Sequence, residues 1–152
     1  MITIRADDLT GADVIDLLRH HQAEMQAGSP KESCHVFDVH RLRAADVTFW
    51  TAWDAETLLG CAALKQLAPD HGEIKSMRTA PAALRRGVGA ALLDHLIVSA
   101  RAAGIERLSL ETGSGPLFEP AAALYARFGF TPCPPFADYR PDPFSRFLSR
   151  AV

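Results

Sequence analysis

The 152-residue sequence lacks the features that mark several specialised classes of protein. Its three cysteines, Cys34, Cys61 and Cys133, stand far apart and form no CxxC pair, which excludes a disulfide-stapled secreted domain and indicates reduced thiols. No apolar run is long enough to span a membrane, and the first residues carry neither a basic leader nor the apolar core of a signal peptide. We therefore expect a soluble, cytoplasmic protein.

An excess of charge of one sign is also missing. Sixteen Lys and Arg residues nearly balance 18 Asp and Glu residues, for a net charge of −2. This balance gives no general attraction to nucleic acid or to an anionic membrane, so neither is an expected partner. The six histidines show no HExxH or other ligand spacing, so no metal site is expected. Any anion that binds must be held by a local site.

The composition and the hydrophobic patterns that are present indicate an ordinary globular fold. With 48% hydrophobic and 22% charged residues, the chain is expected to form one domain over residues 1–152. Periodicity predicts strands over 2–5, 47–53, 58–64, 72–79, 107–112 and 145–150, and helices after Thr10, after Pro81 and over 120–128. Residues 31–45 fit a helix or a loop equally well. Because helices link only some consecutive strands, we predict an α/β fold with a mixed, largely antiparallel sheet.

A glycine-containing segment, Leu84 to Ala90, lies between a predicted strand and the longest amphipathic helix. Gly87 and Gly89 let the backbone approach a ligand, and the free N–H groups at a helix start favour a phosphate. Arg85 and Arg86 add positive charge beside these groups. The third glycine of a dinucleotide-binding motif and the Gly-Lys-Ser/Thr of a P-loop are both absent. The segment therefore predicts a phosphate site, and the alternative is that its glycines only ease a tight turn.

Three segments together resemble the GNAT superfamily of acyl-CoA-dependent N-acyltransferases, and the similarity extends from about Val47 to Phe130. The segments are residues 73–81, 85–93 and 123–130. The resemblance implies the GNAT-like fold order β-α-(α)-β-β-β-α-β-α-β-β, with helices flanking the central sheet. It also suggests a homodimer. Two positions differ from the family pattern, because Leu84 replaces a Gln or Arg and Phe118 replaces a frequent Asn.

The same resemblance implies acetyl-CoA as the cofactor and assigns residues to it. The pantetheine arm would pair with the strand residues Met77, Arg78 and Thr79. The pyrophosphate would be held by the backbone of Arg85, Arg86, Gly87, Val88, Gly89 and Ala90.

Acylation of an amine requires a base and an acid, because the attacking ammonium must lose a proton and the departing thiolate must be neutralised. The resemblance implies Tyr125 as the acid, although this residue also fits a core aromatic on an amphipathic helix. Glu73 is the leading base, because it lies eleven residues before Leu84, as in histone-acetylating relatives. A solvated strand end is the alternative for Glu73. Glu111, His71 and a base acting through water remain open.

The acceptor is expected to lie among residues of the later loops. We expect Glu111, Phe118, Phe136 and Tyr139 to contribute to its pocket, since loops at the end of a sheet commonly form ligand sites. The expected reaction transfers an acetyl group from acetyl-CoA to a primary amine of a small molecule, peptide or protein in a ternary complex. The alternative is a catalytically silent module of the same fold that binds acyl-CoA or a partner. A nucleotide-binding α/β protein is a remoter alternative.

Overall fold

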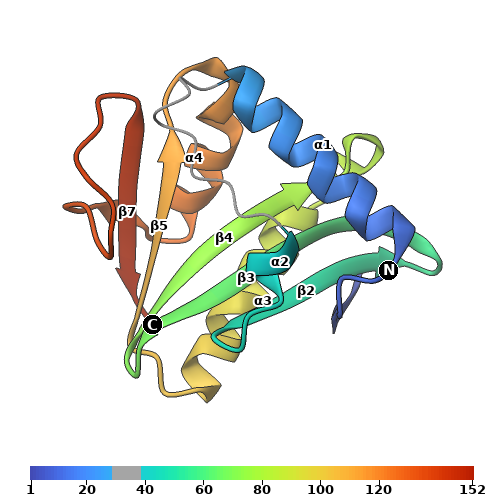
Figure 1. The fold of residues 1–152 in the computed structure, drawn as a ribbon, viewed down its shortest axis with the longest axis horizontal. Helices are drawn as coiled ribbons and strands as arrows, with labels where there is room; N and C mark the ends of the chain where they lie inside the picture. The colour runs from blue at the N-terminus through green and yellow to red at the C-terminus, as the bar shows by residue number, and fades with distance from the viewer. Residues whose placement is uncertain (29–38) are drawn as a thin grey trace.

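A computed structural model describes residues 1–28 and 39–152 (Figure 1). Residues 31–38 of the segment 31–45, for which helix and loop were both open, lie outside the described residues, and Val39–Leu42 of the described part form a short helix. The predicted fold class is confirmed. In chain order the elements are β1 (Thr3–Ala6), α1 (Ala12–Gly28), α2 (Val39–Leu42), β2 (Val47–Asp54), β3 (Thr57–Ala68), β4 (His71–Thr79), the 3-10 turn η2 (Pro81–Ala83), α3 (Val88–Ala102), β5 (Arg107–Gly113), the 3-10 turn η3 (Pro116–Phe118), α4 (Glu119–Arg127), β6 (Thr131–Pro132) and β7 (Ser145–Ala151).

The strands form a seven-stranded sheet in the order β1-β2-β3-β4-β5-β7-β6. All neighbouring strands are antiparallel except β4 and β5, which run parallel. These two strands pair only at His71, Gly72 and Glu73 of β4, although β4 continues to Thr79 and β5 to Gly113. Figure 1 shows them diverging from this shared start. The sheet therefore has an opening between the later halves of β4 and β5.

A bulge in β4 changes which side chains face each side of the sheet. Ser76 has a φ of 51°, and the register moves from Ala63↔Lys75 to Cys61↔Arg78, so β4 contains one extra residue there. Before the bulge, Ile74 packs into the core under α3, which turns its neighbours Glu73 and Lys75 to the opposite face. After the bulge, Met77 packs on the α3 side and Arg78 forms an ion pair with Glu24 of α1. Glu73, Lys75 and Arg78 consequently share the α1 side.

Two apolar cores sandwich the sheet. One contains the buried stripe of α3 together with Tyr125 of α4, and the other contains the stripe of α1 with Leu42 of α2. Trp50 and Trp53 lie in different cores, as expected from their odd spacing along a strand. No helix in residues 1–28 and 39–152 is long and apolar enough to cross a membrane.

The helix predicted after Pro81 begins later than the sequence suggested. Pro81 to Ala83 form only a 3-10 turn, and α3 starts at Val88. Gly87 adopts a φ of 80° immediately before it, a backbone conformation that favours glycine and interrupts a continuous helix. The apolar residues that recur every three or four positions along α3 are buried, namely Val88, Leu92, Leu93, Leu96, Ile97 and Ala100. The delayed start places the first turn of α3 beside β4, where it lines the opening in the sheet.

The buried histidine of α1 makes the stability of this fold depend on pH. His21 is 8% exposed, and its pKa falls from 6.5 to about 4 because of burial first and then the charges of Arg78 and His20. Between these two pH values the unfolded chain binds a proton that the folded chain does not, so the free energy of unfolding decreases by up to about 3 kcal/mol as the pH is lowered from 6.5 to 4. We expect urea denaturation of the wild type between pH 7 and pH 4.5 to show this loss.

The His21→Leu variant lacks the titrating group and should lose correspondingly less stability over the same pH interval. Equal losses in the two proteins would contradict the assignment to His21.

Candidate active site

The opening between β4 and β5 forms a cleft of about 720 Å³. Its walls come from both faces of the sheet, because α1 borders one side and the start of α3 and the helix α4 border the other. Apart from these helices, the cleft is lined by β4, β5, the turns η2 and η3, the loop before α3, and Tyr139 and Phe144 from the segment between β6 and β7. A ligand in this cleft would therefore contact elements that are far apart in the sequence.

The first turn of α3 offers unbonded backbone donors to one end of the cleft. Gly87 has no side-chain cap, and the N–H groups of Val88, Gly89 and Ala90 precede the first carbonyl partners of the helix. A Cβ at Gly87 would have no atom within 4 Å, whereas one at Gly89 would lie 3.0 Å from Leu124 Cδ2 of α4. Gly87 thus supplies the turn and open space, and Gly89 allows close packing. This geometry suits an anionic group.

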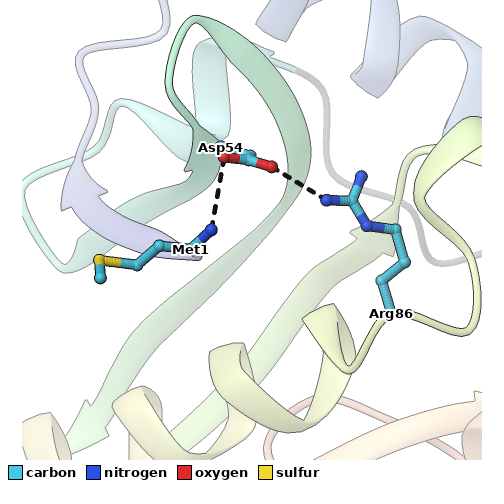
Figure 2. A network of polar contacts seen from close by, with 3 residues as sticks. All are labelled: Met1, Asp54 and Arg86. Carbon is cyan, nitrogen blue, oxygen red and sulfur yellow. Dashed lines mark hydrogen bonds and ion pairs between the residues drawn. The ribbon is translucent and has the colours of Figure 1, made fainter.

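The two arginines before this helix differ in position. Arg85 lines the cleft together with Leu84. Arg86 is not among the lining residues, and its Nη2 lies 3.0 Å from Oδ2 of Asp54 at the turn between β2 and β3 (Figure 2). The hydrogen bond from Arg86 is the largest cause of the lowered pKa of Asp54, whose Oδ1 also lies 3.4 Å from the amino group of Met1. Arg86 therefore ties the loop before α3 to the hairpin.

The strand residues predicted for the cofactor divide between the two faces. Met77 and Thr79 face the first turn of α3, with Met77 Cε 3.7 Å and Thr79 Oγ1 4.0 Å from the position of a Cβ at Gly89. Arg78 turns to the other face and pairs with Glu24. All three residues line the cleft. The side chain of Arg78 therefore lies on the α1 side, unlike those of Met77 and Thr79.

Glu73, the predicted base, lies in a buried polar cluster on the α1 side. The residue is 3% exposed, and its Oε2 accepts a 2.6 Å hydrogen bond from the hydroxyl of Tyr139 and a 3.1 Å bond from Nζ of Lys75. Lys75 Nζ also donates to the Tyr139 oxygen at 2.9 Å. Burial is the main cause that lowers the pKa of Lys75, while burial followed by the charge of Glu73 raises the pKa of Tyr139. The solvated strand end considered for Glu73 is excluded.

Tyr125, the predicted acid, lines the cleft from the opposite side. Tyr125 belongs to α4 and is buried in the core that also contains the apolar stripe of α3. Its ring packs edge to face on Phe130 at a centroid distance of 5.8 Å. Burial raises the pKa of Tyr125 to about 12, so the phenol keeps its proton at neutral pH. Tyr125 is therefore both a core aromatic and a proton-bearing group at the cleft.

The remaining candidates fall partly inside the cleft. Glu111 and Phe118 line it, as does Tyr139, but Phe136 does not and instead packs against Tyr139 and His71. The His71 ring is engaged by Ser109, whose Oγ lies 2.7 Å from Nε2. Within the described ranges, no group of three His, Cys, Asp or Glu residues is arranged to hold a metal ion.

Some residues at the cleft were not singled out from the sequence. Lys75 follows Glu73 by two positions, and strand alternation alone would have placed it on the same face. His21, Glu24 and Arg78 meet at the cleft through tertiary packing of α1, which no local pattern reveals. His21 Nδ1 and Arg78 Nε are buried without a hydrogen-bond partner among the described residues.

Comparison with known proteins gives a consistent assignment. The sequence pattern of the acetyltransferase (GNAT) family matches residues 14–130. The uncharacterized N-acetyltransferase YsnE of Bacillus subtilis is 51% identical over 149 residues, which cover 98% of this chain and 99% of that protein.

Two solved structures extend the similarity to the fold. One is classed as an acyl-CoA N-acyltransferase from Klebsiella pneumoniae, with a TM-score of 0.79, 27% identity and coverage of 99% of this chain and 97% of the other. The second is a GNAT family acetyltransferase from Elizabethkingia anophelis with acetyl-CoA bound. It has a TM-score of 0.72 at 20% identity and covers 99% of this chain and 98% of the other.

The family pattern spans most of the chain, and the relative from Bacillus subtilis aligns over nearly its whole length. The resemblance seen in the sequence motifs is confirmed. The chain belongs to the GNAT family and is an N-acyltransferase.

Proposed function

We propose that the protein transfers an acetyl group from acetyl-CoA to a primary amine of a small molecule, peptide or protein by direct attack in a ternary complex. The observation that carries this proposal is the cleft through the sheet. Backbone donors of α3 border it on one face, and the buried carboxylate of Glu73 borders it on the other. Donor and acceptor can then approach from opposite faces and react where the cleft passes between β4 and β5.

The α3 side suits acetyl-CoA. Its diphosphate fits the N–H groups of Val88, Gly89 and Ala90, because a helix start combines free donors with a positive dipole end. Beyond Glu73, the edge of β4 that faces β5 has no strand partner among the described residues, so the backbone of Met77 to Thr79 can pair with pantetheine amides. The Elizabethkingia relative, which shares the fold and holds acetyl-CoA, supports this choice. Bound there, the cofactor supplies an activated thioester.

The protein groups then divide the proton transfers between the two faces. Glu73 accepts the proton that the acceptor ammonium must lose, and Glu111, which also lines the cleft, is the second candidate for this role. Tyr125, whose raised pKa of about 12 keeps it protonated at neutral pH, donates its proton to the sulfur as the carbon–sulfur bond breaks, and its phenolate then takes up the second proton that the nitrogen loses on becoming an amide. No covalent intermediate on the protein is required.

Calorimetry with acetyl-CoA, followed by detection of free thiol with a panel of amines, tests the proposal. We expect saturable binding of acetyl-CoA and thiol release that depends on the amine. Absence of binding at millimolar cofactor would exclude the proposal. Binding without thiol release on any amine would instead favour a silent acyl-CoA-binding module.

Replacing Tyr125 by Phe removes the phenolic proton but keeps the ring that packs on Phe130. We expect kcat to fall by about 100-fold or more, since general acid catalysis contributes on this scale. The dissociation constant of acetyl-CoA, measured by calorimetry, should stay nearly unchanged. A kcat within a few-fold of wild type would show that Tyr125 has only a packing role.

The neighbouring arginines provide a matched pair for the cofactor site. Because Arg85 lines the cleft and Arg86 pairs with Asp54, Arg85→Ala should weaken acetyl-CoA binding more than Arg86→Ala. We expect roughly fivefold for Arg85→Ala, equivalent to about 1 kcal/mol, and less than about twofold for Arg86→Ala. Equal losses by calorimetry, or a larger one for Arg86→Ala, would contradict the assignment.

A further inference from the structure

The hydrogen bonds of Glu73 within the described residues all end on one carboxylate oxygen. Tyr139 and Lys75 both donate to Oε2, at 2.6 and 3.1 Å, and they also contact each other at 2.9 Å. The three side chains form a closed triangle in the wall of the cleft. Such an arrangement fixes the plane of the carboxylate, because two donors restrain the same atom from different directions.

Tyr139 reaches this triangle from the segment between β6 and β7, where its ring packs against other aromatic rings. Its ring contacts Phe136 and Phe147, with centroid distances of 5.2 and 5.6 Å, and Phe147 belongs to β7 and is buried. The segment is also anchored by a 2.9 Å backbone hydrogen bond from Cys133 to Phe147. The hydroxyl of Tyr139 is therefore held in position by aromatic packing as well as by its hydrogen bonds.

The chemistry of the two donors suits a supporting role. The pKa of Tyr139 is raised, by burial first and then by Glu73, so its hydroxyl keeps the proton that it donates. The Lys75 ammonium provides the opposite charge that a carboxylate buried at 3% exposure requires. Removing either donor would leave Oε2 less restrained and the carboxylate less compensated.

We propose that Lys75 and Tyr139 are positioning residues that hold Glu73 by Oε2 and so leave Oε1 as the atom that accepts the proton of the amine. This inference rests on the proposed function, in which Glu73 is the base. It assigns to Tyr139 a role different from direct contact with the acceptor, and it adds Lys75 to the machinery of the site.

The proposal has a consequence for the pH dependence of catalysis. Donors to an ionised carboxylate favour its charged form, so the variants should hold a proton on Glu73 to higher pH than the wild type does. Several other charged or titratable groups also face this cluster or line the cleft around it, namely Lys65 of β3, Glu111 of β5, Arg78 of β4 and His21 and Glu24 of α1. A control must therefore separate hydrogen bonding from general charge.

Tyr139→Phe and Lys75→Met are the test variants, and Lys65→Met is the matched control. Lys65 is the cross-strand partner of Glu73, so its replacement removes the same charge nearby. We expect Tyr139→Phe to lower kcat by about tenfold and to move the acidic limb of the pH–rate profile to higher pH, with KM for acetyl-CoA unchanged. Lys75→Met should move the limb further, and Lys65→Met by less than half as much.

A change in turnover alone does not show that Lys75 and Tyr139 act through Glu73. The same variants are therefore also titrated without substrate. Carbon-13 NMR of labelled glutamate carboxyl groups, with the Glu73 signal assigned through Glu73→Gln, follows protonation without any substrate. We expect the Glu73 signal to titrate at higher pH in Tyr139→Phe than in the wild type. Coincident titration curves, or an unmoved acidic limb in an active enzyme, would overturn the proposal.

The two hypotheses fail differently. If the wild type acetylates no amine, the proposed function fails, while the NMR titration still tests how Glu73 is held. Tyr139→Phe keeps the aromatic packing of the segment, so the test survives even if Lys75→Met does not fold. A thermal unfolding scan of each variant identifies that case.

Discussion

The brief parallel pairing of β4 with β5 is the constraint on which the rest of the site depends. The strands share three consecutive pairs and then separate, although both continue for several more residues. A sheet that stayed paired would have no passage through it, and its backbone groups would be consumed by the ladder. Because the strands separate, the later part of β4 has an edge with no strand partner in residues 1–28 and 39–152, and a cleft connects the two faces of the sheet there.

The bulge at Ser76 then distributes side chains between these faces. Without the extra residue, Arg78 would fall on the same face as Ile74, and Met77 would fall with Glu73. With the extra residue, the apolar Met77 lies beside the first turn of α3, and Glu73, Lys75 and Arg78 of β4 lie on the side of the sheet that α1 covers. The apolar, glycine-lined side fits a cofactor that is bound largely by backbone groups. The polar side fits an amine whose proton must be removed.

The sequence predicted the fold well where a local period carried the signal. The spacing of apolar residues predicts both α3 and the strands, because the face of an element that is buried in the core carries apolar side chains at regular intervals. The start of α3 was less predictable. Pro81 resembles a helix start, but Leu84 is extended and both Arg85 and Gly87 have a positive φ, so α3 starts only at Val88.

The candidate site was predictable in proportion to how local its parts are. Tyr125 and the segment 85–90 were identified from contiguous motifs, and most of them line the cleft. The partner of Arg86 is Asp54, which is distant in the sequence, so its orientation depends on tertiary packing. The contact between Glu73 and Tyr139, which are 66 positions apart, also depends on tertiary packing, as does the position of His21 of α1 at the cleft. Neither could be predicted from a local pattern. Whether the identified residues act as assigned remains a prediction.

A crystal structure of the protein with acetyl-CoA tests the central claim most directly, namely that the cleft admits the cofactor from the α3 side. The account predicts the diphosphate on the amides of Val88, Gly89 and Ala90, the pantetheine along the free edge of β4, and the sulfur beside Tyr125. A complex in which the cofactor occupies the α1 side, or lies outside the opening between β4 and β5, would contradict it.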